Sequence, residues 1–239
     1  MVMRKLYLLS IYLAFFSCSK EKRTTLFSIV DPSDSGVDFV NKVSDGNEFN
    51  VLTYRNFYNG GGVSLGDVND DGFIDIYFSA NMGENKLYLN QGNWKFDEVS
   101  KIAKVQGTKG WTTGVAFADV NGDGLLDIYV CNSGDVEGDN KQNELFINQG
   151  DLTFKEEALE YRLADPGYST HASFFDYDKD GDLDVYLLNN SYQAIGSFDL
   201  RRNERPKRDK DGGDKLLENQ NGKFIDVSEK SGIYGSVIG

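Results

Sequence analysis

The fold is decided by the stretch Asp67-Val-Asn69-Asp-Asp71-Gly72-Phe73-Ile-Asp75, because its pattern occurs twice more, over residues 119–127 and 176–184. Each copy has oxygen-bearing side chains at positions 1, 3, 5 and 9 and glycine at position 6. Ca²⁺ takes about six to eight oxygen ligands, which a short loop supplies by turning alternate side chains inward around a glycine. The pattern therefore predicts three calcium loops.

The expected ligands in each loop are the side chains at positions 1, 3, 5 and 9 and the backbone carbonyl at position 7. They are Asp67, Asn69, Asp71, Phe73 and Asp75; Asp119, Asn121, Asp123, Leu125 and Asp127; and Asp176, Asp178, Asp180, Asp182 and Asp184. We expect about three ions, the third site, with four side-chain carboxylates, binding most tightly. The alternative is a solvated turn, since Asp, Asn and Gly favour turns without metal. Three copies in one strand context argue against it.

The twelve-residue EF-hand loop is excluded, because its position 12 requires a bidentate Glu. Position 12 here is Phe78, Val130 or Leu187. The residues after each loop are β-branched and aromatic, as are those before it, which is typical of strands. Each metal loop is therefore predicted to join two strands.

The repeat continues beyond each loop with two more strands around an Asn/Gly turn. The third strands begin near Asn85, Asn143 and Asp214, and the fourth strands begin at phenylalanine, as in Phe96. Loops start 52 and 57 residues apart. A recurring unit of four antiparallel strands predicts an all-β protein built of β-propeller blades. Residues 60–239 hold about three blades, and closure needs roughly four to eight, so we expect an open arc of a larger propeller and an N-terminal fragment.

These motifs resemble FG-GAP/VCBS-type repeats, which build calcium-binding propellers in integrin α-chains and in many bacterial surface proteins. The segments Phe57–Gly62, Thr170–Asp178 and Gly181–Asn190 resemble more narrowly the ASPIC/UnbV, or cartilage acidic protein-like, group. The resemblance covers roughly residues 27–239. It implies a calcium-stabilised scaffold but no particular activity.

The N-terminus has the pattern of an export signal. Arg4 and Lys5 precede an apolar run over residues 6–16, which is too short to span a bilayer. Its end at Cys18 resembles a bacterial lipobox, so residues 1–18 are predicted to be a lipoprotein signal with Cys18 lipidated, placing the protein at the outer membrane or cell surface. A plain signal peptide and a disulfide between Cys18 and Cys131 are the alternatives. In the segment 19–59, residues 27–30 are expected to be a clasp strand that completes another blade.

The charge composition of the chain limits the classes of partner that it can bind. The net charge is −13, which argues against nucleic acid, since that partner requires a basic surface. Contact with the membrane is expected only through the lipid. Cys131, alone after a strand, is expected to be a small buried hydrophobic residue.

A four-stranded meander places the metal loops and Asn/Gly turns on one face and the other connections on the opposite face. The longest of those connections, residues 189–213, is basic. Its arginines are the predicted ligand-face residues for an anionic protein or glycan ligand at the cell surface, the alternative being a solvated loop: Arg201, Arg202, Arg205 and Arg208.

Catalysis has little support, because the chain has one histidine, His171, and no nucleophile or phosphate-loop motif. His171 is interpreted as a strand residue satisfied by hydrogen bonds, the alternative being a general base near the propeller axis. The sequence thus predicts a calcium-stabilised, noncatalytic binding or adhesion propeller tethered to the bacterial envelope. The alternatives are a noncatalytic portion of a polysaccharide-acting enzyme and a structural subunit of an envelope complex.

Overall fold

The structure of the chain, a computed structural model, describes residues 25–54, 56–134, 141–190 and 208–233. The chain divides into two units, Met1–Asp31 and Pro32–Gly239. In the first unit residues 25–31 are described, and they form neither helix nor strand. The expected clasp at residues 27–30 is therefore not a strand here, and its pairing with another blade stays a prediction. Cys18 and the export signal lie outside the described residues.

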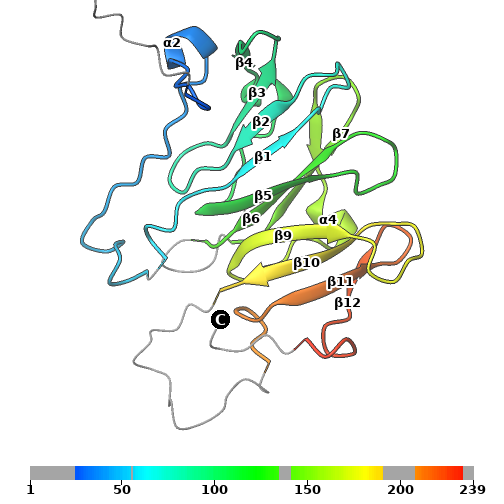
Figure 1. Cartoon of the computed structure of the whole chain (residues 1–239). Helices are drawn as coiled ribbons and strands as arrows, with labels where there is room; N and C mark the ends of the chain where they lie inside the picture. The colour runs from blue at the N-terminus through cyan, green and yellow to red at the C-terminus, as the bar shows by residue number, and fades with distance from the viewer. Residues whose placement is uncertain (1–24, 55, 135–140, 191–207, 234–239) are drawn as a thin grey trace, which may run out of the picture. The chain divides into compact units, whose positions relative to one another are not determined.

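The described residues of the second unit form three four-stranded antiparallel sheets, each with its strands in chain order (Figure 1). We call them blades 1, 2 and 3. Blade 1 comprises β1 (Val63–Gly66), β2 (Asp75–Phe78), β3 (Lys86–Asn90) and β4 (Phe96–Glu98). Blade 2 comprises β5 (Thr112–Ala118), β6 (Asp127–Asn132), β7 (Glu144–Asn148) and β8 (Phe154–Glu156). Blade 3 comprises β9 (Ser169–Phe175), β10 (Asp184–Asn189), β11 (Lys215–Asn219) and β12 (Phe224–Asp226).

The predicted all-β fold and its propeller-type blades are confirmed. The first strands of successive blades are neighbours, β1 beside β5 and β5 beside β9. In blades 1 and 2, equivalent tyrosines bind the connection that follows the blade. The Tyr77 hydroxyl donates to the carbonyl of Val105 at 2.6 Å, and that of Tyr129 donates to the carbonyl of Leu163 at 2.9 Å. Tyr186 instead donates to the Asp214 carboxylate at 2.9 Å.

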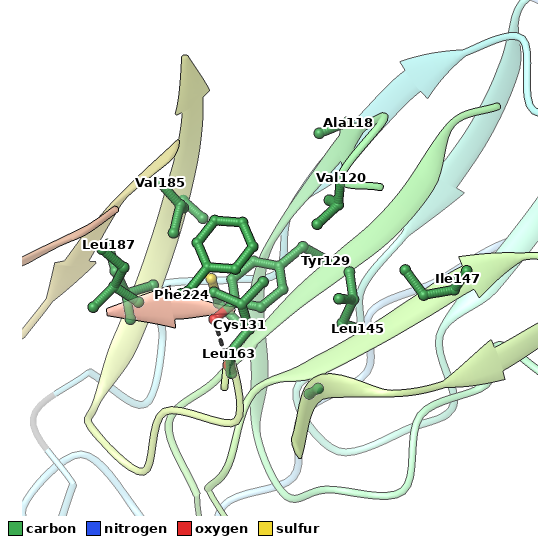
Figure 2. Close-up of a cluster of buried hydrophobic side chains, with 13 residues drawn as sticks. Ala118, Val120, Tyr129, Cys131, Leu145, Ile147, Leu163, Val185, Leu187 and Phe224 are labelled. Atoms are coloured by element: carbon green, nitrogen blue, oxygen red, sulfur yellow. Dashed lines mark hydrogen bonds between the residues drawn. The ribbon is translucent and has the colours of Figure 1, made fainter. Parts of the chain in front are cut away.

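Blade 2 is buried on both faces, and β6 shows why. Ile128 and Val130 lie in the core shared with blade 1, whereas Tyr129 and Cys131 lie in the core shared with blade 3. Figure 2 shows the second of these cores, where Tyr129 and Cys131 lie close to Leu187 of blade 3. Because side chains alternate between the faces of a strand, an unbroken apolar run in β6 supplies both interfaces.

Cys131 is fully buried and free. Burial raises the pKa of its thiol well above its usual range, so the group stays neutral in an apolar setting. The interpretation of Cys131 as a buried hydrophobic residue is confirmed.

Short helices complete the described unit: α2 (Pro32–Ser35), α3 (Ser100–Ala103) and α4 (Ala158–Tyr161). Both α3 and α4 follow the last strand of a blade and end at a left-handed residue, Lys104 (φ 62°) and Arg162 (φ 62°). Sequence reasoning missed them, because four residues are too few to show a helical period. Among the described residues, no helix has the length and apolar character needed to cross a membrane.

The segment before blade 1 packs on that blade. Phe39 stacks on Phe78 with ring centroids 4.8 Å apart, and Asn41 and Asn81 exchange hydrogen bonds of 2.8 and 3.0 Å. Further along, Tyr54 and Phe57 form a separate apolar cluster with Trp111. This segment therefore belongs to the packed unit.

Candidate metal loops

The three predicted metal loops lie at equivalent places in the blades. Each joins the first and second strands, as expected: β1 to β2, β5 to β6 and β9 to β10. The Asn/Gly turns between third and fourth strands lie on the same face, since the Asn148 amide of the blade 2 turn donates to the Val68 carbonyl of the blade 1 loop at 2.8 Å. The expectation that metal loops and Asn/Gly turns share one face is confirmed for this pair of blades.

Position 9 of each loop is a fully buried aspartate whose two carboxylate oxygens accept backbone N–H groups. Asp127 accepts from Val120 and from Asn148, both at 2.9 Å. Asp75 and Asp184 are 0% exposed like Asp127 and repeat the arrangement. Their partners are Val68 (2.9 Å) and Asn90 (2.8 Å), and Tyr177 (2.9 Å) and Asn219 (2.8 Å). Position 9 thus ties the start of the loop to the end of the third strand, whatever else it binds.

Position 1 receives the backbone of the glycine turn. Asp67 accepts the N–H of Gly72 at 2.7 Å, and Asp119 accepts that of Gly124 at 2.9 Å. The glycines have φ of 86° and 92°, in the left-handed region that a side chain disfavours. Asp176 and Gly181 repeat the contact at 3.3 Å. Glycine at position 6 therefore lets the turn wrap around the first aspartate.

Positions 3 and 5 face each other in the first two loops. The Asn69 amide nitrogen donates to Asp71 at 2.9 Å, and Asn121 donates to Asp123 at the same distance. The Oδ1 atom of Asn69 is buried without a hydrogen-bond partner, and so is Oδ1 of Asp182 in the third loop. Buried polar atoms are normally paired. The unpaired Oδ1 of Asn69, which is a predicted ligand atom, is therefore of the kind that a bound cation would satisfy.

The third loop brings its carboxylates closest together. Oxygen atoms of Asp176, Asp178 and Asp184 lie within 4.8 Å of one another. All three come from loop positions 1, 3 and 9, as the sequence predicted. Oxygen-only donors of this kind suit a hard divalent cation such as Ca²⁺.

Burial, followed by repulsion from neighbouring carboxylates, raises the pKa of two loop aspartates. Burial raises the pKa of Asp127 to about 6, with a further contribution from the neighbouring carboxylates of Asp123 and Asp119. Burial likewise raises the pKa of Asp182 to about 6, helped by Asp180 and Asp184. The crowded carboxylates in the loops therefore disfavour their own negative charge, and a bound cation would offset this cost.

Position 7, where a carbonyl ligand is predicted, also has a packing role. A Cβ atom added at Gly92 would lie 3.4 Å from the Phe73 ring, and one at Gly150 would lie 3.5 Å from Leu125. The side chains at position 7 therefore cover the Asn/Gly turns of blades 1 and 2. The orientation that this packing gives each residue was not foreseen from the ligand pattern.

Of the other predicted site residues, the structure describes Arg208 and His171. Arg208 forms an ion pair with Asp226 of β12 and is thereby held against its own blade; Arg201, Arg202 and Arg205 lie outside the described residues. His171 lies in β9, as expected, but it is exposed and its side chain makes no hydrogen bond to the described residues. The interpretation of His171 as a hydrogen-bonded strand residue stays a prediction.

Sequence reasoning missed the role of Asn90, Asn148 and Asn219. Besides donating backbone N–H groups to position 9, Asn90 and Asn148 bind the carbonyls of Ile74 (2.9 Å) and Leu126 (3.1 Å) through their side-chain amides. The available signal was their recurrence at one place in every repeat.

Comparison with known proteins places the chain in a class. Residues 67–130 and 133–187 match the FG-GAP-like repeat family. With three antiparallel blades around equivalent loops in its described residues, this is an FG-GAP-like repeat protein with blades of the β-propeller type.

The particular relatives are cartilage acidic proteins, to which the chain is homologous. It is 30% identical over 167 residues to cartilage acidic protein 1 of Mus musculus, covering 68% of this chain and 24% of the relative. It is 28% identical over 170 residues to cartilage acidic protein 1 of Homo sapiens, covering 69% and 24%. The aligned part thus spans about a quarter of the length of these curated relatives.

Proposed function

We propose that the chain is a calcium-stabilised, noncatalytic binding domain, exported and held at the bacterial cell envelope by a lipid on Cys18. The calcium part rests chiefly on the three carboxylates Asp176, Asp178 and Asp184, whose oxygens lie within 4.8 Å of one another. The unpaired Oδ1 atom of Asn69, at position 3 of the first loop, supports it independently.

The ions would be held by the side chains at positions 1, 3 and 5 and by the carbonyl at position 7, with the buried aspartate at position 9 contributing its remaining lone pairs. Bound Ca²⁺ would supply positive charge that offsets the mutual repulsion of the carboxylates. The loops would then stiffen the ends of the first and second strands of each blade, and binding free energy would become folding free energy. This role is architectural and involves no reaction.

A noncatalytic role is favoured by the surroundings of the titratable groups. The most perturbed carboxylates belong to the loops. His171 has no acid or base in hydrogen-bond contact among the described residues. A general base needs a partner or substrate within hydrogen-bond reach. Recognition of a protein or glycan ligand would instead use the connections opposite the metal loops, since variable loops on a rigid scaffold carry most binding sites.

Thermal unfolding tests the calcium proposal. The purified chain is stripped with a chelator and melted alone, with excess Ca²⁺ and with equal Mg²⁺. A ligand present at 100 times its dissociation constant stabilises the folded state by about 2.7 kcal/mol, so Ca²⁺ should raise the melting temperature by several degrees and Mg²⁺ by less. A melting temperature that is the same in calcium and in chelator would refute calcium stabilisation.

The anchor is tested separately, in bacteria fed a labelled fatty acid. The wild-type chain and the Cys131→Ala variant should both carry the label and partition with membranes. Cys18→Ala should be unlabelled. Equal labelling of Cys18→Ala would exclude lipidation at this cysteine. An unlabelled wild-type chain would refute the lipid anchor and favour export by a plain signal peptide.

A further inference from the structure

The second candidate metal loop contains an asparagine followed by a glycine, Asn121 and Gly122, and both residues are exposed. An asparagine can lose its side-chain amide when the backbone nitrogen of the next residue attacks its side-chain carbonyl carbon and ammonia leaves, which is one reason why asparagine is thermolabile. Glycine resists this attack least, because it has no Cβ atom. The chain has two further Asn-Gly pairs, at Asn59 and Asn221. What distinguishes Asn121 from them is its surroundings.

The hydrogen bonds around Asn121 bring together the groups that this reaction needs. The N–H of Gly122 donates to a carboxylate oxygen of Asp119 at 2.8 Å, within the reach required of a general base. The side-chain carbonyl of Asn121 accepts the N–H of Asp123 at 3.0 Å, and Asp119 shares this N–H. A donor in this place stabilises negative charge that develops on the carbonyl oxygen. The amide nitrogen, which is the leaving group, donates to the Asp123 carboxylate at 2.9 Å and thereby orients the amide.

The other two loops each lack part of this arrangement. In the first loop the equivalent amide, Asn69, is followed by Asp70, and its Oδ1 atom has no hydrogen-bond partner among the described residues. In the third loop the backbone N–H groups at positions 4 and 5 make the equivalent contacts, at 2.6 and 3.2 Å. Position 3 of that loop is Asp178, however, which has no amide to lose. Of the three loops, the second therefore combines the amide, the glycine, the base and the donor.

The Asn-Gly pair at Asn221 also differs from the one in the second loop. There the N–H of Gly222 donates to the side-chain oxygen of Asn219 at 2.8 Å. An amide oxygen is a far weaker base than a carboxylate. The same dipeptide is thus exposed at both places, but a carboxylate receives the glycine N–H only in the second loop of this pair of sites.

We propose that Asn121 is a site of spontaneous deamidation in the metal-free loop, promoted by the Asp119 carboxylate and by the N–H of Asp123. The nitrogen of Gly122 forms a bond to Cγ of Asn121 while its proton passes to Asp119. The Cγ–Nδ2 bond then breaks, and ammonia leaves with that proton. Water opens the resulting succinimide ring to aspartate or to isoaspartate, so the complete reaction consumes one water molecule and releases one molecule of ammonia.

The aspartate product would give the second loop the charge of the third. A carboxylate at position 3 would join those of Asp119, Asp123 and Asp127, which makes four, the number in the third loop. Burial and neighbouring carboxylates already raise the pKa of Asp127 to about 6, so a further negative charge adds repulsion. The number of charged ligands also sets the affinity of Ca²⁺ loops. Deamidation would therefore make the loop depend more strongly on a bound cation, a consequence that rests on the proposed calcium function, whereas the reaction itself does not.

The test follows the amide directly. The purified chain is incubated in chelator at neutral pH and physiological temperature, so that the outcome does not depend on calcium binding. Peptide mass spectrometry measures the gain of one mass unit at each asparagine, and an isoaspartate assay identifies the second product. In the folded chain Asn121 should lose its amide several-fold faster than Asn59 and Asn221. In denaturing urea, where the contacts with Asp119 and Asp123 are absent, the three rates should become similar.

Two variants separate the glycine from the base. Gly122→Asp copies the first loop, where Asp70 occupies the same position with φ of 57°, against 75° for Gly122. No atom lies within 4 Å of a Cβ atom built at Gly122, so this variant should fold, and Asn121 should react several-fold more slowly because the new side chain hinders attack. Asp119→Asn keeps a hydrogen-bond acceptor, removes the carboxylate and should also slow the reaction. Thermal melts in chelator check that both variants are folded.

Three results would overturn the proposal. The first is a folded wild-type chain in which Asn121 keeps its amide as long as Asn59 and Asn221 keep theirs. The second is a rate at Asn121 that does not fall when the chain is unfolded in urea. The third is a folded Gly122→Asp chain that loses the Asn121 amide as fast as the wild type, a result that stands even if Asp119→Asn does not fold.

Discussion

The buried carboxylate of Asp127 accepts the backbone N–H of Asn148 at 2.9 Å, across 21 positions of sequence. Its other oxygen accepts the N–H of Val120 at 2.9 Å. Blades 1 and 3 repeat both contacts. A residue that the ligand pattern predicts to bind metal is therefore also a joint between the loop and the third strand.

This double role predicts that Asp127→Asn destabilises the chain without metal as well as with it. Asparagine keeps one acceptor oxygen and turns an NH₂ group towards a backbone N–H, which leaves a buried donor unpaired at a cost of about 1–3 kcal/mol. Urea unfolding in chelator measures the loss. Asp123→Asn, at an exposed position of the same loop, should change stability in chelator only a little. Equal losses for the two variants would show that the hydrogen bonds of Asp127 to the loop and to the third strand do not stabilise the fold specifically.

In the third loop, the effect of Asp178→Asn on the melting temperature should have opposite signs in chelator and in excess Ca²⁺. The Asp178 carboxylate lies near those of Asp180 and Asp184, which raise its pKa together with desolvation, the leading cause. Asp178→Asn should therefore raise the melting temperature slightly in chelator, where it relieves repulsion, and lower it in excess Ca²⁺, where it removes a ligand. Thermal melts of both proteins under both conditions provide the measurement, and a decrease of the same size in both would argue against a cation site.

Close approach of the first strands predicts that Gly114→Ala destabilises the packing of blade 2 on blade 3. The added methyl group would lie 2.4 Å from the Thr170 carbonyl oxygen and 2.9 Å from the His171 Cα atom. Overpacking of this kind costs about 1–3 kcal/mol. Gly46→Ala, where no atom lies within 4 Å of the new methyl group, is the matched control for denaturant unfolding. A stable Gly114→Ala chain would show that the strands can move apart freely.

The core between blades 2 and 3 predicts different outcomes for adjacent leucines. Leu187 is fully buried in the core that also contains Tyr129 and Cys131 (Figure 2). Leu188 is 45% exposed. Leu187→Ala should cost about 2–5 kcal/mol, the range for a buried leucine, and Leu188→Ala less than half as much. Unfolding curves with a common denaturant slope measure the difference. Similar losses would mean that the two faces of β10 are not distinct.

Much of this fold is readable from local sequence because the repeat is local. The strand before Asp119, the loop itself and the strand after Asp127 are each specified within a few residues by alternation and turn chemistry. Repetition in three copies then distinguishes a blade from an isolated hairpin. The short helices α3 and α4 were not predicted, because one helical turn shows no periodicity. Each of them ends at a left-handed residue, Lys104 or Arg162.

By itself the sequence determined the blade repeat, the strand-loop-strand setting of the aspartates and the oxygen chemistry of the loops. Tertiary structure alone decided which residues are neighbours: that Asp127 meets Asn148, that Gly114 faces His171, and that Tyr54 packs on Trp111. The physical reason is that periodicity and turn propensity act over a few neighbouring residues. Contacts between blades join residues dozens of positions apart, and only packing of the complete sheets brings them together.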